Sequence, residues 1–282
     1  MNTRALRIVG LAFLVVGLVA ALPPAGHAQF VLYDDFQNGI IDPEKWRGFI
    51  RDGTAAGPGA ELIRRVEDGR LHLSLTSYGD AAANTGNAIA SQGLFLKQVG
   101  QPGGSGFITG LKTTITVLAA RAPDCSANPE NSGPRVQING TFFNDGSSTG
   151  PSDRTGDIQV YLILLKNPAT GGNTINVGVQ RCGSPTCSPF ENLAGGQFAT
   201  PWSLHVPVAV KVIWQEAEQR FRFVANGETK DVPYPAGIEP AAPPAFDFKQ
   251  AHLLNFVKNC TESRKKGKIE AVFDQFEVRR QP

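Results

Sequence analysis

The polar side chains with the most regular spacing in the chain are amides and a phenol that alternate with apolar residues. Gln137 and Asn139 flank Ile138, and Gln159 and Tyr161 are spaced in the same way. Successive side chains of a β-strand point to opposite faces, so these pairs are expected on the face turned away from the core. With Trp202 added as a platform for stacking, the predicted ligand-binding residues are Gln137, Asn139, Gln159, Tyr161, Asn176, Gln180 and Trp202. Amides and a phenol suit sugar hydroxyls; the alternative interpretation is that they merely face solvent.

The sequence offers only weak candidates for residues that could cleave a bond. His72, His205 and His252 stand alone, and no G-x-S-x-G string is present. We interpret each histidine as a structural or surface imidazole within a strand. The closest acidic spacing, Glu216-x-Glu218, falls between two predicted strands and is typical of a solvated turn.

The elements that position these residues are strands. Leu71, Leu73 and Leu75 alternate with polar residues, and a stripe of alternating apolar residues runs from Val206 to Trp214. Further strands are expected at residues 110–119, 135–143, 157–165, 174–181, 221–224, 253–258 and 268–279. Residues 78–106 and 121–131 are predicted to be long surface loops. About a dozen strands without crossover helices indicate an all-β fold of two stacked antiparallel sheets.

The four cysteines favour disulfides over metal binding. Cys182 and Cys187 flank a Gly-Ser-Pro-Thr turn, which predicts a Cys182–Cys187 bridge and, by elimination, Cys125–Cys260. A zinc site is the alternative, but no C-x-x-C pair supplies the usual ligand spacing.

The N-terminus has the pattern of an export signal. Arg4 and Arg7 precede an apolar run, and small residues end at Ala28, so residues 1–28 are predicted to be a signal peptide. The remaining residues 29–282 are expected to form one domain. They carry equal numbers of acidic and basic residues, which gives no electrostatic reason to expect nucleic acid, and they contain no further span-length apolar stretch. The predicted location is the periplasm or the extracellular space.

Several strings along this part of the chain resemble the concanavalin A-like lectin/glucanase superfamily. They are residues 33–36 (YDDF), 41–46 (IDPEKW), 67–71 (EDGRL), 212–214 (VIW), 221–228 (FRFVANGE) and 273–278 (FDQFEV). The resemblance implies a jelly-roll β-sandwich. It leaves the activity open, because the superfamily includes lectins, carbohydrate-binding modules, hydrolases and lyases.

The catalytic patterns of that superfamily are missing from this sequence. No E-x-D-x-x-E strand is present, although laminarinase-type hydrolases place their acids in one. The alginate-lyase pattern Q-[IV]-H becomes Gln137-Ile138-Asn139, so its histidine is replaced by an amide.

The same resemblance implies one cofactor at most, a structural calcium ion. Its expected ligand is Asp274 in the last strand, with Asp35 and Gly69 as neighbours. Asp274 bonded to neighbouring protein groups is the alternative.

The sequence therefore predicts an exported β-sandwich that binds a polysaccharide or another glycan without cleaving it. One alternative is a polysaccharide hydrolase or lyase with a non-standard catalytic set. The other is a structural or adhesive domain that recognises another protein.

Overall fold

A computed structural model describes residues 28–51, 60–78, 88–97, 106–122, 133–167, 170–257 and 266–281. Most of these residues lie in strands, and the only helical segment among them is the 3-10 helix η1 (Glu216–Glu218). None of the described helices is long and apolar enough to cross a membrane.

The first sheet contains eight strands in the order β13-β12-β11-β6-β15-β4-β3, with β1 paired to β15. Its strands are β1 (Phe30–Asp34), β3 (Ala60–Glu67), β4 (Arg70–Tyr78), β6 (Ile108–Arg121), β11 (Val208–Gln215), β12 (Arg220–Ala225), β13 (Glu228–Pro233) and β15 (Lys266–Arg280). All of the pairings are antiparallel.

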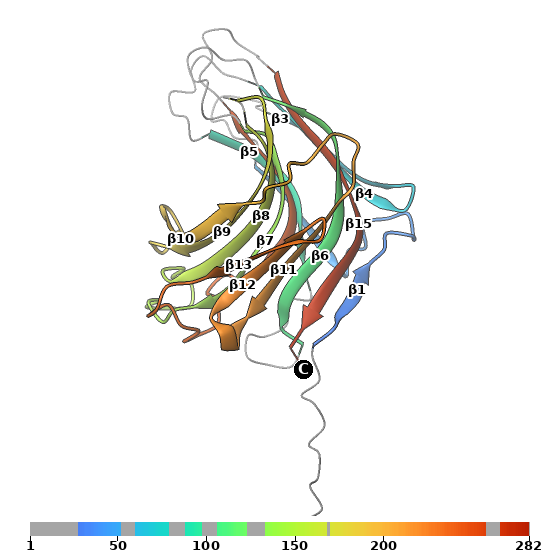
Figure 1. Cartoon of the computed structure of the whole chain (residues 1–282). Coiled ribbons are helices and arrows are strands. Elements are labelled where there is room, and N and C mark those ends of the chain that lie inside the picture. The colour runs from blue at the N-terminus through green and yellow to red at the C-terminus, as the bar shows by residue number, and fades with distance from the viewer. Residues whose placement is uncertain are drawn as a thin grey trace, which may run out of the picture.

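The second sheet contains seven antiparallel strands in the order β10-β9-β8-β7-β14-β5-β2. They are β2 (Trp46–Arg51), β5 (Ala88–Leu96), β7 (Arg135–Asn144), β8 (Asp157–Lys166), β9 (Asn173–Cys182), β10 (Phe190–Gln197) and β14 (Lys249–Val257). Figure 1 shows β10, β9, β8 and β7 in one layer and β12, β11, β6 and β15 in the other. The fold is the predicted jelly-roll sandwich.

Several details of the strand prediction were wrong, and two of them concern β11 and β5. Strand β11 begins at Val208, because His205 has a positive φ of 62° in the preceding turn and Val206 is half exposed. The predicted loop at residues 78–106 contains β5, which lies inside the second sheet. Gly93 in the middle of β5 hides the strand pattern, yet it is required there: an added Cβ would lie 2.4 Å from the carbonyl oxygen of Ala251.

The apolar faces of both sheets meet in one core, which includes Trp46 and Trp214. Trp46 packs edge-on against Tyr33 and Phe276, and its Nε1 donates a hydrogen bond to Asp34 Oδ2 over 2.7 Å. Trp214 stacks on Phe143. Each such aromatic pair contributes about 0.5–1.5 kcal/mol beyond the burial of its area.

One cation is buried in this core. The Lys249 side chain is inaccessible to solvent, and its Nζ lies 4.8 Å from the Phe107 ring centroid and 4.7 Å from that of Phe142. Nζ also donates to the carbonyl oxygen of Thr141 and, over 2.8 Å, to Asp247 Oδ1. Burial lowers the pKa of Lys249, while the Asp247 carboxylate acts in the opposite direction.

The predicted Cys182–Cys187 disulfide is confirmed, and it ties the end of β9 to the loop before β10. Cys125, Cys260 and residues 1–27 of the predicted signal peptide lie outside the described residues.

Candidate functional site: a polar groove on the second sheet

The face of the second sheet that is turned away from the core carries a groove of about 400 Å³. The described residues that line it come from six strands; they are Ser91, Arg135, Gln137, Asn139, Gln159, Tyr161, Ile163, Gln180, Phe190, Gln250, His252 and Leu254.

The alternation of the sequence explains why polar residues gather here. Along β7, Val136 and Ile138 are fully buried in the core, and Gln137 and Asn139 point to the opposite face. The register then aligns the strands: Asn139 lies opposite Gln250 of β14 on one side and Tyr161 of β8 on the other. The groove is therefore a direct product of strand pairing.

A hydrogen bond between β7 and β14 fixes the tautomer of His252, the histidine that lines the groove. Gln137 Nε2 donates to His252 Nδ1 over 2.8 Å, and Gln250 Nε2 lies 3.5 Å from the same nitrogen. Burial, with the nearby charge of Arg135, lowers the pKa of His252 to about 3. The imidazole is therefore neutral near pH 7, with its proton on Nε2.

The groove also holds a guanidinium and a phenol. Burial lowers the pKa of Arg135 to about 10, so this side chain remains charged at neutral pH. Burial raises the pKa of Tyr161, which keeps the phenol protonated. The Tyr161 ring lies over Gly178 of β9, where an added Cβ would come within 2.3 Å of both Cζ and the hydroxyl oxygen.

Several polar atoms of the groove lack hydrogen-bond partners in the described part of the chain. They are Asn139 Oδ1, Gln159 Oε1, Gln250 Oε1 and His252 Nε2. The side chains of Asn139, Gln250 and His252 are all more than nine-tenths buried. A buried polar atom without a partner costs about 1–3 kcal/mol, so a ligand that supplies donors to the amides and an acceptor to the imidazole would recover that energy.

Five of the seven predicted ligand-binding residues line this groove, and two do not. Asn176 lies on the same face but outside the lining, and its Nδ2 donates to Thr174 Oγ1 over 3.2 Å. Trp202 does not provide a stacking platform: only 2% of it is exposed, and its Nε1 donates to the Leu165 carbonyl oxygen. As an aromatic residue with a satisfied N–H, it is part of the core instead.

Some groove residues were not predicted from the sequence, among them Arg135, Gln250, His252 and Phe190. His252 and Gln250 were missed because the strand was expected to begin at residue 253, whereas β14 begins at Lys249. Phe190 is 44% exposed at the start of β10, a strand that was not predicted. It supplies the aromatic surface that had been expected from Trp202.

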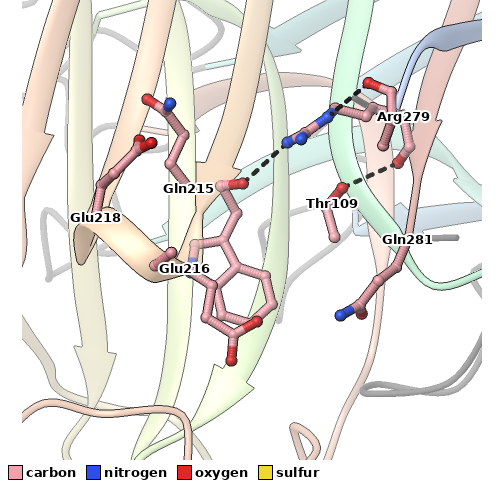
Figure 2. Close-up of a pocket in the computed structure, with 9 residues that line it drawn as sticks. Thr109, Gln215, Glu216, Glu218, Arg279 and Gln281 are labelled. Carbon is pink, nitrogen blue, oxygen red and sulfur yellow. Dashed lines mark hydrogen bonds between the residues drawn. The ribbon is translucent and has the colours of Figure 1, made fainter. Parts of the chain in front are cut away.

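The chemistry of the groove differs from that of a retaining glycosidase. No Asp or Glu is present among its described lining residues, whereas retaining hydrolysis uses two carboxyl groups about 5–5.5 Å apart. Glu216 and Glu218 lie elsewhere, in η1, and Figure 2 shows their carboxylates pointing away from each other. Glu218 pairs with Arg220 over 3.2 Å.

Figure 2 shows a second pocket, of about 600 Å³, beside η1. Its prominent cation is already engaged: Arg279 Nε donates to the carbonyl oxygen of Ala28 over 3.0 Å, and its Nη1 donates to that of Trp214 over 3.2 Å. Thr109 Oγ1 in turn donates to the Arg279 carbonyl oxygen. These contacts join β6, β11 and β15, so this arginine has a structural role.

The residues of the expected calcium site make hydrogen bonds with other protein groups. Gln37 Nε2 lies 3.3 Å from the carbonyl oxygens of both Asp35 and Gly69 and donates to each. An amide nitrogen thus occupies the position between two oxygens that the ion was expected to use. Asp274 lies at a bulge of β15, and its own carbonyl oxygen accepts from Thr113. The described residues contain no group of three or more His, Cys, Asp or Glu that could hold a metal.

Comparison with solved structures agrees with this architecture. The chain superimposes with a TM-score of 0.50 on a GlcNAcα1-4Gal-releasing endo-β-galactosidase from Clostridium perfringens (13% identity), covering 91% of this chain and 64% of that one. The TM-score is also 0.50 for the catalytic domain of an endo-1,3-β-glucanase (laminarinase) from Thermotoga petrophila, at 12% identity and with 90% and 99% of the two chains covered. A glycoside hydrolase family 16 endo-glucanase from Bacteroides ovatus gives 0.50 at 11% identity, with 87% and 98% covered.

These structures define the class of fold as a concanavalin A-like jelly roll, as the sequence strings predicted. No family model matches the chain, and no curated protein sequence matches it.

Proposed function

We propose that this protein binds a polysaccharide in the groove of the second sheet and releases it unchanged. One observation carries the proposal: three amide oxygens and one imidazole N–H, all from residues that line the groove, have no partners among the described residues. Sugar hydroxyls both donate and accept hydrogen bonds, so a single ligand class satisfies all four atoms. The carboxylate-free lining supports binding over hydrolysis.

We also propose that the protein acts outside the cytoplasm. The Cys182–Cys187 disulfide supports an oxidising compartment, and the sequence pattern of residues 1–28 supports export. Mass spectrometry of the protein recovered from its native host tests this proposal. A mature N-terminus at Gln29 is expected, whereas a retained Met1 would contradict it.

Affinity electrophoresis through gels that contain neutral or acidic polysaccharides tests the binding function. We expect one polymer class to retard the purified protein, and a Gln159→Ala/Tyr161→Ala double variant to lose that retardation. Glu216→Ala is the matched control, since this residue lines the second pocket and not the groove. Equal mobility in a broad panel would overturn the proposal, as would equal retardation of the double variant.

Cleavage by elimination is a second candidate, and one observation favours it. The Q-[IV]-H pattern lacks its histidine, yet Gln137 is hydrogen-bonded to His252 from the neighbouring strand, beside Arg135. In elimination from a uronate, a base removes the proton next to the carboxylate, the bond to the leaving oxygen breaks, and a C=C bond forms. The leaving oxygen then takes a proton, and no water enters. The charge of Arg135 and the Nε2–H group of His252 can stabilise the carboxylate, and protonated Tyr161 can give the leaving oxygen its proton.

Mass spectrometry of a polysaccharide incubated with the protein separates the three outcomes. Binding alone leaves the polymer intact, which is the expected result. Elimination gives fragments whose masses add up to that of the parent, and hydrolysis adds one water for each bond broken. Either kind of fragment, if lost in the Gln159→Ala/Tyr161→Ala variant, would replace the binding function with that activity.

A further inference from the structure

Removal of the predicted signal peptide would change the surroundings of Arg279 in the second pocket. Ala28 and Arg279 both line this pocket, and the Ala28 carbonyl oxygen accepts a hydrogen bond from Arg279 Nε over 3.0 Å (Figure 2). Ala28 is also the last residue of the predicted signal peptide, so Gln29 would become the first residue of the exported chain. Cleavage there removes the hydrogen-bond acceptor and leaves an α-amine on Gln29.

The new α-amine would stay next to Arg279. Strand β1 pairs with β15, and Phe30 lies directly opposite Arg279. The nitrogen of Gln29 belongs to the same amide as the Ala28 carbonyl oxygen, so it lies within about 5.5 Å of Arg279 Nε. Since the pairing begins at Phe30, removal of Ala28 leaves it in place, and the pairing holds the amine at this position.

The charges around the start of β1 disfavour an ammonium group there. The charged residues come from β15, β11 and η1; they are Arg279, Arg280, Glu277, Lys211, Glu216 and Glu218. Two of the three acids are already paired, Glu277 with Lys112 and Glu218 with Arg220. Figure 2 places Glu216 and Glu218 across the pocket from Arg279. A neighbouring positive charge favours the neutral form of an amine, which is the nucleophile.

The Gln29 side chain is available to react with this amine. It is exposed, and it has no hydrogen-bond partner among the described residues. When glutamine is the first residue, its α-amine can attack Cδ of its own side chain. A C–N bond forms, the bond from Cδ to the amide nitrogen breaks, and ammonia leaves with a proton from the amine. The product is pyroglutamate, an uncharged lactam whose carbonyl group is bonded to the nitrogen that previously carried Ala28.

We infer that Gln29 is a modification site: it cyclises to pyroglutamate after export, and Arg279 then donates to the lactam carbonyl oxygen instead of that of Ala28. The inference rests on the proposed export and on cleavage after Ala28. The departure of Ala28 leaves room for the ring in a pocket of about 600 Å³. The reaction removes a positive charge beside Arg279 and leaves no free amine for an aminopeptidase to bind.

The intact mass of the protein recovered from its native host tests the modification. We expect the mass of residues 29–282 less one ammonia. The measurement uses reduced protein before any digestion, because peptides that begin with glutamine cyclise on their own during digestion. Gln29→Asn is the control: it should keep its full mass, since the shorter side chain would have to close a strained four-membered ring.

The rate of cyclisation in vitro tests the role of Arg279. The chain 29–282, released from a fusion by a protease that cuts before Gln29, should lose ammonia at least about threefold faster than a synthetic peptide of residues 29–35 at pH 7. Arg279→Lys should keep this advantage and Arg279→Gln should lose it. Arg222→Gln is the matched control, because this arginine pairs with Asp231 outside the pocket. Circular dichroism checks that each variant is folded.

The Tm before and after cyclisation tests the contact with the lactam. We expect the Tm to rise, because the charge beside Arg279 is lost and its acceptor is restored. An unchanged Tm would contradict this contact.

The outcomes separate the two proposals. A retained Met1 would contradict the proposed export, and a first residue other than Gln29 would overturn the inference. A chain that begins at Gln29 and keeps its full mass, both from the host and after long incubation in vitro, would also overturn the inference while the export proposal stands. Equal rates for the protein, the peptide and Arg279→Gln would show that Arg279 does not assist the reaction.

Discussion

Gln137 Nε2 donates a hydrogen bond to His252 Nδ1 across the β7–β14 pairing, over 2.8 Å. This contact decides which imidazole nitrogen carries the proton, and it leaves the Nε2–H group without a partner in the described part of the groove. A ligand that approaches His252 therefore meets a donor.

Loss of this hydrogen bond should change the tautomer. We expect Gln137→Ala to convert His252 from the Nε2–H form to a mixture of both forms, and to weaken ligand binding about tenfold. NMR of the imidazole nitrogens reports the tautomer directly. A predominant Nδ1–H form in the unaltered protein would contradict the assignment.

The low pKa of His252 should make folding sensitive to acid. The pKa is about 3 in the folded protein and about 6.5 when the chain is unfolded. The unfolded chain therefore binds more protons between these values, so the contribution to stability is complete above pH 6.5 and is lost as the pH falls toward 3. Urea unfolding measured from pH 7 to pH 4 should show this loss, with a shallower slope for His252→Gln. Identical slopes would show that another group dominates.

The close approach of Tyr161 to Gly178 should make that glycine irreplaceable. In Gly178→Ala the new Cβ would overlap the phenol, so the ring must move and ligand affinity should fall about tenfold. Gly150→Ala serves as the control, because nothing lies within 4 Å of its added Cβ. Titration calorimetry of both variants checks the prediction, and equal affinities would show that the position of Tyr161 is unimportant.

The buried Lys249–Asp247 pair should respond unequally to loss of its two members. Asp247→Asn leaves a buried ammonium without its counter-ion and should destabilise the fold by about 3 kcal/mol. Lys249→Met removes the buried charge and places an apolar chain between Phe107 and Phe142, so its cost should be smaller. Urea denaturation gives both free energies of unfolding. The reverse order would contradict the assignment of Lys249 as a buried cation.

The Gln37 amide between the carbonyl oxygens of Asp35 and Gly69 should make stability independent of calcium. A bound ion at 100 times its Kd would add about 2.7 kcal/mol, which chelation would remove. We expect a chelator to shift the Tm by less than about 1 °C. A drop of several degrees that added calcium reverses would show that an ion site forms despite this contact.

Strand alternation was sufficient to predict much of the fold and five of the twelve described residues that line the groove. It placed Gln137, Asn139, Gln159, Tyr161 and Gln180 on the correct face, because their strands carry apolar residues at the core positions. The fold followed from the same periodicity and from strings that resemble those of the concanavalin A-like superfamily.

Strand alternation fails to predict β14, because its core face carries a charged residue and its groove face carries an apolar one. A lysine, Lys249, points into the core, while Leu254 lines the groove. The alternation is therefore inverted at Lys249 and at Leu254, and His252 lies between these two residues. Trp202 fails for a different reason: only tertiary packing shows that its indole N–H finds the Leu165 carbonyl inside the protein.

The strand order also determines when, during synthesis, the two sheets can be completed. In the second sheet, β14 is the strand that joins the group β10-β9-β8-β7 to the pair β5-β2, and in the first sheet β15 joins β6 to β4. Both joining strands follow all the other described strands of their sheets. During synthesis from the N-terminus, neither sheet is continuous until its joining strand emerges, so the groove forms only after the other six strands of the second sheet have been made.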